Sequence, residues 1–367
     1  MRVALVAHWF AEYCVWQASA LAEHAEVSLL LPEGLLGSAS KVLSPKVRHV
    51  SIPKHPSRSL KNLLAVRDLA KLIRAERPDV IFLHANGHAR LMLGLPWLKG
   101  LPIVATIHDP VPHPGESTWV RRFAGRMLRR RADHFILHGE SLCDEYERVW
   151  GVPRARMSAI PHGVLAYRAW QDEAVKPPAG RYVLLFGRIR PYKGIPVLIE
   201  AARRMRTPPE SLQIVIAGRG DDMAPHLDHI ERAEQRERFV ILNEFLSESM
   251  IDALHRHARA VVLPYTQASQ SGPAATALEY GQPVIASEIG GLPDVVREGE
   301  TGLLVPPGDA EALAGALDRI AEDDGLRERL SAGARRVATD ELSWKALAGP
   351  TMAALKRGIE AHRRGGN

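Results

Sequence analysis

Two cations in the second half of the chain follow an apolar run at short spacing. The run "RYVLLFG" over residues 181–187 leads into "RIRPYKG", so Arg188 and Lys193 lie just beyond a predicted strand. Gly187 allows the chain to turn tightly at that point. An arginine offers forked donors and a lysine offers a point charge, and the two together suit a diphosphate. The alternative is that both are solvated surface cations.

A stretch of small residues, "SQSGPAATALEYG" over residues 269–281, is the second candidate site. Proline at the first helical position and glycine after the last predict a helix over Pro273–Tyr280 that stops at Gly281. Free amides and a partial positive charge at the start of such a helix attract an anion. The residues expected to present this start to a ligand are Gln270, Ser271 and Gly272.

The far end of that predicted helix carries a carboxylate, Glu279, where a negative charge is mildly unfavourable. A carboxylate accepting hydrogen bonds from a vicinal diol is one reason for its position, and a surface glutamate is the other. The segment "IAGRGDD" over residues 216–222 contributes Gly218 to the predicted ligand-binding edge of the sheet. It lacks the last glycine of G-x-G-x-x-G. This absence argues against a dinucleotide fold of the dehydrogenase type.

Histidines follow apolar runs in the first half of the chain. They are His8, His84 and His108, and Asp109 comes directly after the last of these. Ligands of open α/β sheets bind beyond the carboxyl ends of the strands, so these side chains are predicted at a site. His84 and His88 are four residues apart in a glycine-containing loop, which does not favour a metal site. We therefore predict no metal.

Short apolar runs alternate with helical segments along the chain and predict two doubly wound, Rossmann-like α/β domains facing across a cleft. The predicted divisions are an N-terminal domain over residues 1–165, a linker over 166–178, a second domain over 179–345 and a C-terminal helix over 346–367 that packs back on the first domain. The runs span residues 2–8, 26–32, 47–53, 79–84, 102–108, 134–139 and 157–162, and then 181–187, 213–218, 239–243, 260–264, 283–287 and 302–306.

Composition sets the class of protein. The chain has 367 residues, of which 46% are hydrophobic and 25% charged, enough for two ordinary domains. No apolar stretch reaches the roughly 20 residues that cross a bilayer, and no secretory leader is recognised, so we predict a cytoplasmic protein. Cys14 and Cys143 lack metal-ligand spacing and cannot form a disulfide framework.

The net charge of +6 is unevenly distributed. Residues 1–165 hold 22 Lys and Arg against 14 Asp and Glu, and the remainder holds 26 against 28. A basic stretch, "STWVRRFAGRMLRRRADH", predicts an amphipathic helix, as used at anionic membrane surfaces or as a core helix with a solvated face. The predicted membrane contacts, at the inner face of the membrane, are Arg122, Arg126, Arg129 and Arg130. No nucleic-acid motif accompanies these arginines.

These motifs, with "SEIGGLPDVVREGETGLLVPPGD" and the late "LSW", resemble the GT-B retaining glycosyltransferases of family 4, collinearly from about Tyr182 to Trp344. The resemblance implies a nucleotide-diphosphate sugar bound by the second domain and an acceptor bound by the first. Arg188 and Lys193 match the pair that binds the diphosphate. Glu279 matches the second glutamate of the E-x7-E motif, which holds the ribose, and His108 matches the histidine that faces the reacting sugar.

The sequence departs from the family pattern in two places. The first glutamate of E-x7-E would fall at position 271, where this chain has Ser271, with Gln270 beside it. That glutamate usually contacts the transferred sugar, so the identity of the sugar is not carried over. The loop after the first strand is "HWFAEYCVW", whereas relatives often have two glycines there. This loop suggests a narrower or differently placed approach for the acceptor or the phosphates.

The function predicted from the sequence is that of a retaining hexosyltransferase in polysaccharide or glycolipid biosynthesis. The acceptor would be a glycan, a lipid-linked molecule or a small molecule, and Asp109 would support the tautomer of His108. Because Arg188, Lys193 and the helix start near Gly272 can stabilise the departing diphosphate, we predict that no metal or other cofactor is required. The alternatives are a nucleotide-sugar epimerase or hydrolase of the same fold, and a degenerate, non-catalytic binding subunit.

Overall fold

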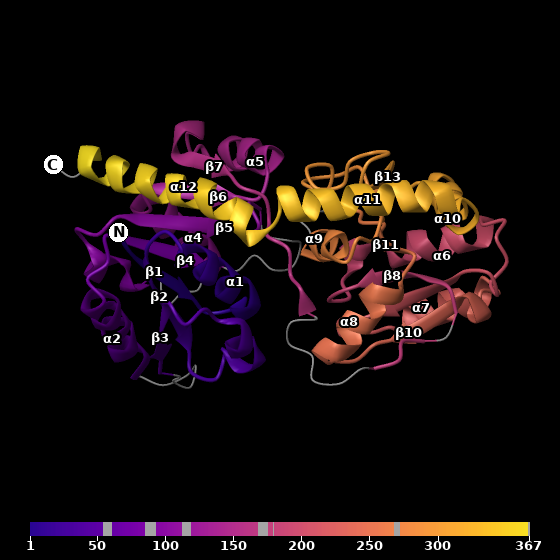
Figure 1. Ribbon diagram of the computed structural model, residues 1–367, viewed down its shortest axis with the longest axis horizontal. Helices are drawn as coiled ribbons and strands as arrows, with labels where there is room; N and C mark the ends of the chain where they lie inside the picture. Colours follow the sequence, from indigo (N-terminus) through magenta and orange to yellow (C-terminus); the bar gives the residue numbers. More distant parts are fainter. Residues whose placement is uncertain are drawn as a thin grey trace. The chain divides into compact units, whose positions relative to one another are not determined.

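The computed structural model describes residues 1–53, 61–84, 93–111, 119–167, 175–178, 180–267 and 272–365, without the side chains of residues 61–65, 120 and 121. The chain forms two compact units (Figure 1). The first unit comprises Met1–Gly163 and Trp344–Asn367, and the second comprises Val164–Ser343. None of the described helices is long and apolar enough to cross a membrane.

A sheet of seven parallel strands forms the centre of the first unit, in the order β3-β2-β1-β4-β5-β6-β7. The order reverses direction between β1 and β4, which is the point where open α/β sheets bind their ligands. The strands are β1 (Arg2–Ala7), β2 (Glu26–Pro32), β3 (Val47–Ile52), β4 (Val80–His84), β5 (Ile103–Ile107), β6 (His134–Leu137) and β7 (Met157–Ala159).

Helices cover both faces of this sheet. On one face, α2 (Lys61–Ala75), α4 (Trp119–Arg131) and α5 (Glu140–Trp150) pack in a common core with side chains such as Ala4, Val6 and Ile81. On the other face lie α1 (Ala11–Leu21) and the C-terminal α12 (Trp344–Gly365), which contact each other. Short 3₁₀ turns span Gly37–Val42, Leu95–Leu98 and Arg154–Arg156.

The last helix returns to the first unit, as Figure 1 shows for α12. It begins at Trp344, whose ring meets Tyr13 of α1 edge-on at a centroid distance of 4.7 Å. It then crosses β4, β5 and β6. At Gly358 the helix lies so close to the sheet that a Cβ would be 2.3 Å from a methyl of Val104. The helix thus begins two residues before the predicted start at residue 346 and is described to Gly365.

The second unit repeats the plan with six parallel strands in the order β10-β9-β8-β11-β12-β13. Here the order reverses between β8 and β11. The strands are β8 (Tyr182–Phe186), β9 (Gln213–Ala217), β10 (Phe239–Leu242), β11 (Ala260–Leu263), β12 (Val284–Ser287) and β13 (Gly302–Val305). Every predicted apolar run of both halves is a strand.

Alternation along the strands divides the interior of the second unit into two cores. Val183 and Leu185 of β8 join one core with α6 (Ile195–Arg204), α7 (Ala224–Arg232) and α10 (Ala310–Glu322). Tyr182 and Leu184 point the other way, into a core with α8 (Glu248–His257), α9 (Gly272–Glu279) and α11 (Asp324–Asp340). Because both faces are covered, the strands read as continuous apolar runs. The predicted fold class, two doubly wound α/β domains, is confirmed.

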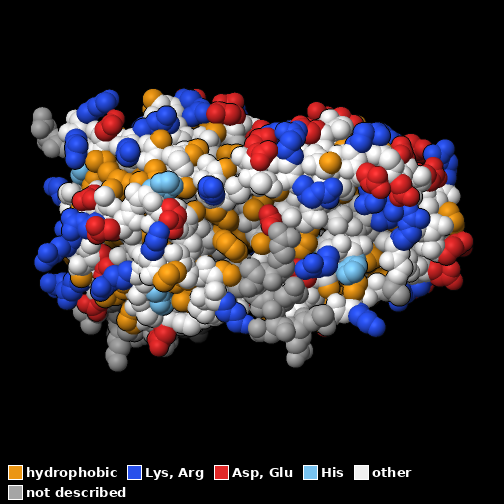
Figure 2. All heavy atoms as spheres, in the orientation of Figure 1, with side chains coloured by type: hydrophobic (Ala, Val, Ile, Leu, Met, Phe, Trp, Pro, Cys, Tyr) orange, Lys and Arg blue, Asp and Glu red, His pale blue; other side chains and the backbone are white. Residues whose placement is uncertain are grey.

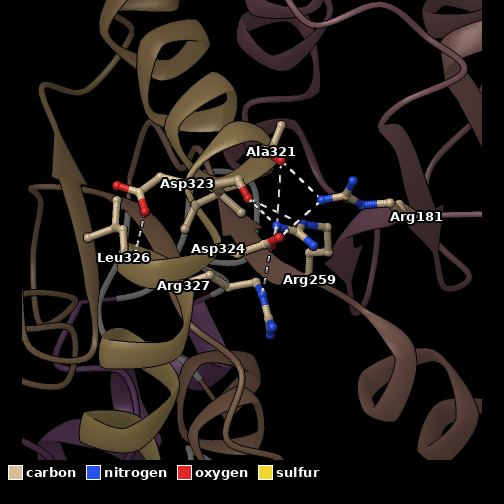
Figure 3. Close-up of polar contacts among 8 residues, drawn as sticks. Arg181, Arg259, Ala321, Asp323, Asp324, Leu326 and Arg327 are labelled. Carbon is tan, nitrogen blue, oxygen red and sulfur yellow. Dashed lines mark hydrogen bonds and ion pairs between the residues drawn. The ribbon is translucent and has the colours of Figure 1, made fainter.

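Arginines at the amino ends of two strands hold the junction between α10 and α11 (Figure 3). Arg259, just before β11, donates to the carbonyl of Ile320 at 2.9 Å, and Arg181, just before β8, donates to that of Ala321 at 3.1 Å. Both guanidinium groups also form ion pairs with Asp324. The last carbonyls of α10, which have no partner within the helix, are thus satisfied by charged donors.

Charge is distributed differently over the two units. On the face drawn in Figure 2, Lys and Arg side chains gather at the left of the picture, over the first unit, while basic and acidic side chains alternate over the second. This distribution agrees with the excess of Lys and Arg in residues 1–165.

Candidate functional site

The segment after β8 is clamped against the end of β11. Lys193 ends a 3₁₀ turn that begins at Pro191, and Gly194 follows with φ of +71°. A Cβ on Gly194 would lie 1.7 Å from the carbonyl oxygen of Pro264, so only glycine permits this approach. The backbone N–H of Thr266 then donates to the carbonyl of Tyr192 at 2.9 Å. This contact holds Lys193 at the reversal point of the second sheet.

Lys193 is a buried cation. Its side chain is 4% exposed, its ammonium donates to the hydroxyl of Tyr265, and Nζ lies 4.2 Å from the centroid of that ring. Burial lowers the pKa of Lys193 to about 8, which still leaves the amine mostly protonated at neutral pH. Among the described side chains no carboxylate forms an ion pair with it. A buried charge without a counter-charge favours the binding of an anion.

The start of α9 lies at the same place. A Cβ on Gly187 would be 3.5 Å from Lys193 Nζ and 3.5 Å from a ring carbon of Pro273. The glycine thus leaves open the space that the lysine and the helix start share. Gly218, with φ of +135°, packs closely against Gly187. A Cβ added on Gly218 would lie 2.4 Å from the carbonyl oxygen of Gly187. An ammonium and a helix N-terminus beside bare backbone form a place for phosphate oxygens.

The remaining residues predicted to bind the donor are dispersed around this point. Arg188 is exposed directly after Gly187, whereas the neighbouring Arg190 forms an ion pair with Asp221 at 2.8 Å. Gly272 is the first residue of α9 and Glu279, half-buried, is the last, about 10 Å away along the helix axis. Gln270 and Ser271 lie outside the described residues.

Three neighbouring strands of the first unit end in histidines that hydrogen-bond one another. His84 closes β4, His108 follows β5, and His138 follows β6. His84 Nδ1 is 3.3 Å from His108 Nε2, and His108 Nδ1 is 3.2 Å from His138 Nε2. All three rings are buried. The side chain of Gln17, from α1, reaches His84 Nε2 at 2.6 Å.

Burial determines the charge of this cluster. It lowers the pKa of His84 and of His138 to about 3, and the pKa of His108 well below its ordinary value. His162, after β7, packs against His138 with a centroid distance of 5.1 Å, and burial lowers its pKa to about 4. The rings are therefore neutral imidazoles at neutral pH. Sequence reasoning missed His138 and His162, although each follows an apolar run as His108 does.

The other residues predicted in the first unit surround this cluster. His8, half-buried, follows β1 and precedes the exposed Trp9 and Phe10. Phe10 has φ of +59°, unusual for a bulky residue, and its ring lies 4.7 Å from that of His108. Asp109, half-buried, lies close enough to favour the charged form of His138.

The rings of His84, His108 and His138 hydrogen-bond one another in a line, so their nitrogens do not converge on one point where a metal ion could bind. Among the residues that the structure describes, no three His, Cys, Asp or Glu side chains are arranged to hold a metal ion. A cavity of about 280 Å³ in the first unit is lined by Arg2, Glu26 and Arg48, among others. It lies at the amino ends of β1 and β2, the opposite edge of the sheet from the histidines.

The helix predicted to contact a membrane, α4, keeps two aromatic side chains in solvent. Ala124 and Leu128 are buried in the core, but Trp119 is 73% and Phe123 is 52% exposed. The arginines Arg122, Arg126 and Arg130 are also exposed. The fourth predicted arginine differs, because the guanidinium carbon of Arg129 lies 4.0 Å above the ring of Trp150.

Comparisons with known proteins show the family to which the chain belongs. The family model described as glycosyl transferases group 1 matches residues 167–337, and that of glycosyltransferase family 4 matches residues 12–165. A glycogen synthase from Mycobacterium tuberculosis is 30% identical over 300 residues, which are 78% of this chain and 71% of that protein. A phosphatidyl-myo-inositol mannosyltransferase from Mycobacterium leprae is 31% identical over 288 residues, 75% of this chain and 72% of that protein.

Solved structures share the fold over nearly the whole chain. The crystal structure of Anabaena Alr3699/HepE in complex with UDP-glucose superposes with a TM-score of 0.74 at 19% identity, covering 97% of this chain and 100% of that one. A glycosyltransferase from Rickettsia africae superposes with a TM-score of 0.70 at 15% identity, covering 98% of each chain. With two doubly wound sheets and family matches to both halves, the chain belongs to the group 1 glycosyltransferases, the family 4 enzymes of the GT-B fold.

Proposed function

We propose that this glycosyltransferase is a retaining hexosyltransferase that takes its sugar from a nucleotide-diphosphate sugar. The acceptor is a glycan, a lipid-linked molecule or a small molecule of polysaccharide or glycolipid biosynthesis. The observation that carries the proposal is Lys193, a buried ammonium beside the start of α9 and the bare backbone of Gly187. Support for the donor class comes from the Anabaena structure, which was solved with UDP and with UDP-glucose.

In this proposal, residues of the second unit stabilise the departing nucleoside diphosphate. When the bond from the anomeric carbon to the diphosphate breaks, negative charge grows on the departing phosphate oxygens. Lys193, Arg188 and the amides at the start of α9 supply positive charge there without a metal. Glu279, at the other end of α9, accepts from the ribose hydroxyls.

The first unit supplies the acceptor side in this proposal. His108, with Asp109 next to it, faces the reacting sugar, and His84 and His8 border the acceptor. Because the rings of His84 and His108 are neutral, they add no charge beside the reacting sugar. The sugar itself is left open, because the residue that usually contacts it corresponds to Ser271.

The test is donor turnover by the Lys193→Ala protein. We expect kcat/KM for the donor to fall by about 10²- to 10³-fold, as for loss of one charge-stabilising donor. The control is Lys99→Ala, an exposed lysine of the first unit, which should keep wild-type activity. Turnover of Lys193→Ala close to that of the wild type would remove the diphosphate assignment.

The same assay separates the alternatives. A transferase consumes donor slowly until an acceptor is added, whereas an epimerase or hydrolase consumes it without one. A non-catalytic binding subunit consumes none under either condition. Thermal shift with a panel of nucleotide sugars identifies the donor to use, because a ligand that binds only the folded protein raises its melting temperature.

We also propose that α4 contacts an anionic membrane surface. Its solvent side combines the exposed rings of Trp119 and Phe123 with Arg122, Arg126 and Arg130. Aromatic rings partition to the lipid interface and arginines attract acidic headgroups. A helix whose exposed side served only solvation would have no need of two large apolar rings there.

Flotation with anionic vesicles tests this contact. Substituting Arg122, Arg126 and Arg130 with Glu should release the protein from the vesicles, and Trp119→Ala with Phe123→Ala should weaken binding at unchanged charge. The control carries the same charge change on α12, with Lys356, Arg363 and Arg364 replaced by Glu; all three are exposed. Equal recovery of the α4 and α12 variants would exclude a specific role for α4.

A further inference from the structure

A single line of hydrogen bonds runs through the buried end of the first sheet. It begins at the carbonyl oxygen of Ile160, which is 3.1 Å from His138 Nδ1. It passes from His138 Nε2 to His108 Nδ1 and from His108 Nε2 to His84 Nδ1, at 3.2 Å and 3.3 Å. It ends at the Gln17 side-chain amide, whose Oε1 is assigned 2.6 Å from His84 Nε2. Three imidazoles thus use both ring nitrogens in one continuous chain.

The first link fixes the direction of the others. A carbonyl oxygen only accepts, so His138 Nδ1 carries a hydrogen. A neutral imidazole has one N–H, so His138 Nε2 carries no hydrogen. Its lone pair must therefore accept from His108 Nδ1–H. By the same step His108 Nε2 accepts from His84 Nδ1–H. His84 Nε2 then carries no hydrogen, and its lone pair faces Gln17.

The amide of Gln17 completes the chain in one of two ways. With its oxygen toward His84, the four links need four hydrogens, and three neutral rings supply only three. One ring would then be an imidazolium, buried among other imidazoles. With its NH₂ toward His84, the chain is complete and uncharged. Because oxygen and nitrogen of an amide are told apart by their partners, both orientations fit the same atomic positions.

The cost of burying a charge favours the NH₂ orientation. The Tyr13 hydroxyl, which also hydrogen-bonds Gln17, fits either orientation because a hydroxyl can both donate and accept. Neighbouring imidazoles and burial both oppose a positive charge at His108. Turning an amide costs far less than placing an unpaired charge in the interior.

We propose that Gln17, His84 and His138 are positioning residues that hold His108 as the uncharged tautomer with its proton on Nδ1. The other titratable groups packed around the chain are His162 after β7, Tyr13 and Cys14 on α1, and Asp109 beyond β5. The inference rests on the proposed function only where it places His108 beside the reacting sugar. The tautomer is a property of the free protein.

Ring ¹⁵N NMR of the histidine-labelled full chain measures the tautomer directly, without substrate. At neutral pH we expect His84, His108 and His138 each to show a pyrrole-type Nδ1 and a pyridine-type Nε2. A proton on His108 Nε2, or an imidazolium signal from any of the three, would overturn the proposal. Because no turnover is needed, this result stands or fails independently of the proposed function.

The Gln17→Glu variant tests the end of the chain at nearly unchanged shape. A carboxylate cannot donate, so His84 Nε2 must be protonated to form the hydrogen bond. We therefore expect the chain of three rings to hold a fourth proton, as an imidazolium paired with the new negative charge. That ring should titrate about one to three pH units higher than in the wild type. The acid limb of the pH profile of sugar transfer should move with it. We expect kcat to fall by a larger factor than the factor by which KM for the donor changes.

Gln17→Met is the matched control, since it has similar length but neither donates nor accepts. It removes only the last link, so the tautomers that the Ile160 carbonyl sets should remain, and neither the imidazolium nor the displaced acid limb should appear. Unchanged ring signals and an unchanged acid limb in Gln17→Glu would contradict the proposal. If Gln17→Glu does not fold, the ring ¹⁵N signals of the wild-type protein still test the proposed tautomer of His108.

Discussion

Two cations of one motif differ in their surroundings. Arg188 and Lys193 are five residues apart, and the sequence treats them as a pair. In the structure Arg188 is exposed while Lys193 is buried against Tyr265. A lysine adapts to burial by shifting its pKa, whereas a guanidinium stays charged. The pH response of the donor site should therefore come from Lys193.

The affinity for a nucleoside diphosphate should depend on pH through Lys193. Its pKa in the free protein is lowered to about 8, so the charged form is complete below that pH and is lost above it. We expect the dissociation constant to be flat at neutral pH and to rise toward tenfold per pH unit above about 8, because binding requires the protonated amine. Titration calorimetry across that range measures it.

Lys193→Arg is the control for this dependence. A guanidinium does not titrate in the range, so the variant should bind more weakly but with a flat profile. A flat profile for the wild type to well above pH 8 would show that another group supplies the charge.

At the scale of elements, the junction of α10 and α11 depends on Arg259. Its side chain is 13% exposed and satisfies the carbonyl of Ile320 through two of its nitrogens (Figure 3). Arg259→Ala leaves that carbonyl without its charged donor, and we expect the free energy of unfolding of the second unit to fall by about 2 kcal/mol. Urea denaturation followed by far-UV circular dichroism measures this change.

Arg181→Ala serves as the comparison, because its side chain is half exposed and its ion pair with Asp324 is solvated. We expect a loss below about 1 kcal/mol. Arg181 also donates to the carbonyl of Ala321, so equal losses for the two variants would mean that burial of Arg259 adds nothing to such contacts.

The elements themselves were predictable because each strand is covered on both faces. Residues 182–186, for example, form a strand in which neighbouring side chains enter different cores, so the whole run is apolar. The side of α4 that faces the core was not predictable. A helical wheel groups Trp119 and Phe123 with Ala124 and Leu128, but only the latter two reach the sheet.

For the whole molecule, buried histidines predict an acid-sensitive first unit. Burial lowers the pKa of His84, His134, His138 and His162 to between about 3 and 4, and it lowers the pKa of His108 well below its ordinary value. The unfolded chain binds protons below about pH 6.5, where these folded rings stay neutral. Stability is thus complete above about pH 6.5 and is lost as the pH falls toward the folded values.

Differential scanning calorimetry between about pH 7 and about pH 5 tests this expectation, above the range where carboxylates titrate. The second unit has fewer such rings, chiefly His255, whose pKa is lowered to about 4. The transition of the first unit should therefore shift to lower temperature more steeply. Parallel shifts of both transitions would show that the histidine cluster does not govern acid stability.

The sequence by itself determined the strands, the two doubly wound sheets and the family. These depend on local patterns, namely apolar runs, helix signals and the spacing of Arg188, Lys193 and Glu279. Only the tertiary structure decided that Lys193 is buried beside the start of α9, and that His84, His108 and His138 form one chain with Gln17. The physical reason is that burial and hydrogen bonding join residues far apart in sequence, and no local pattern records which ring nitrogen faces which partner.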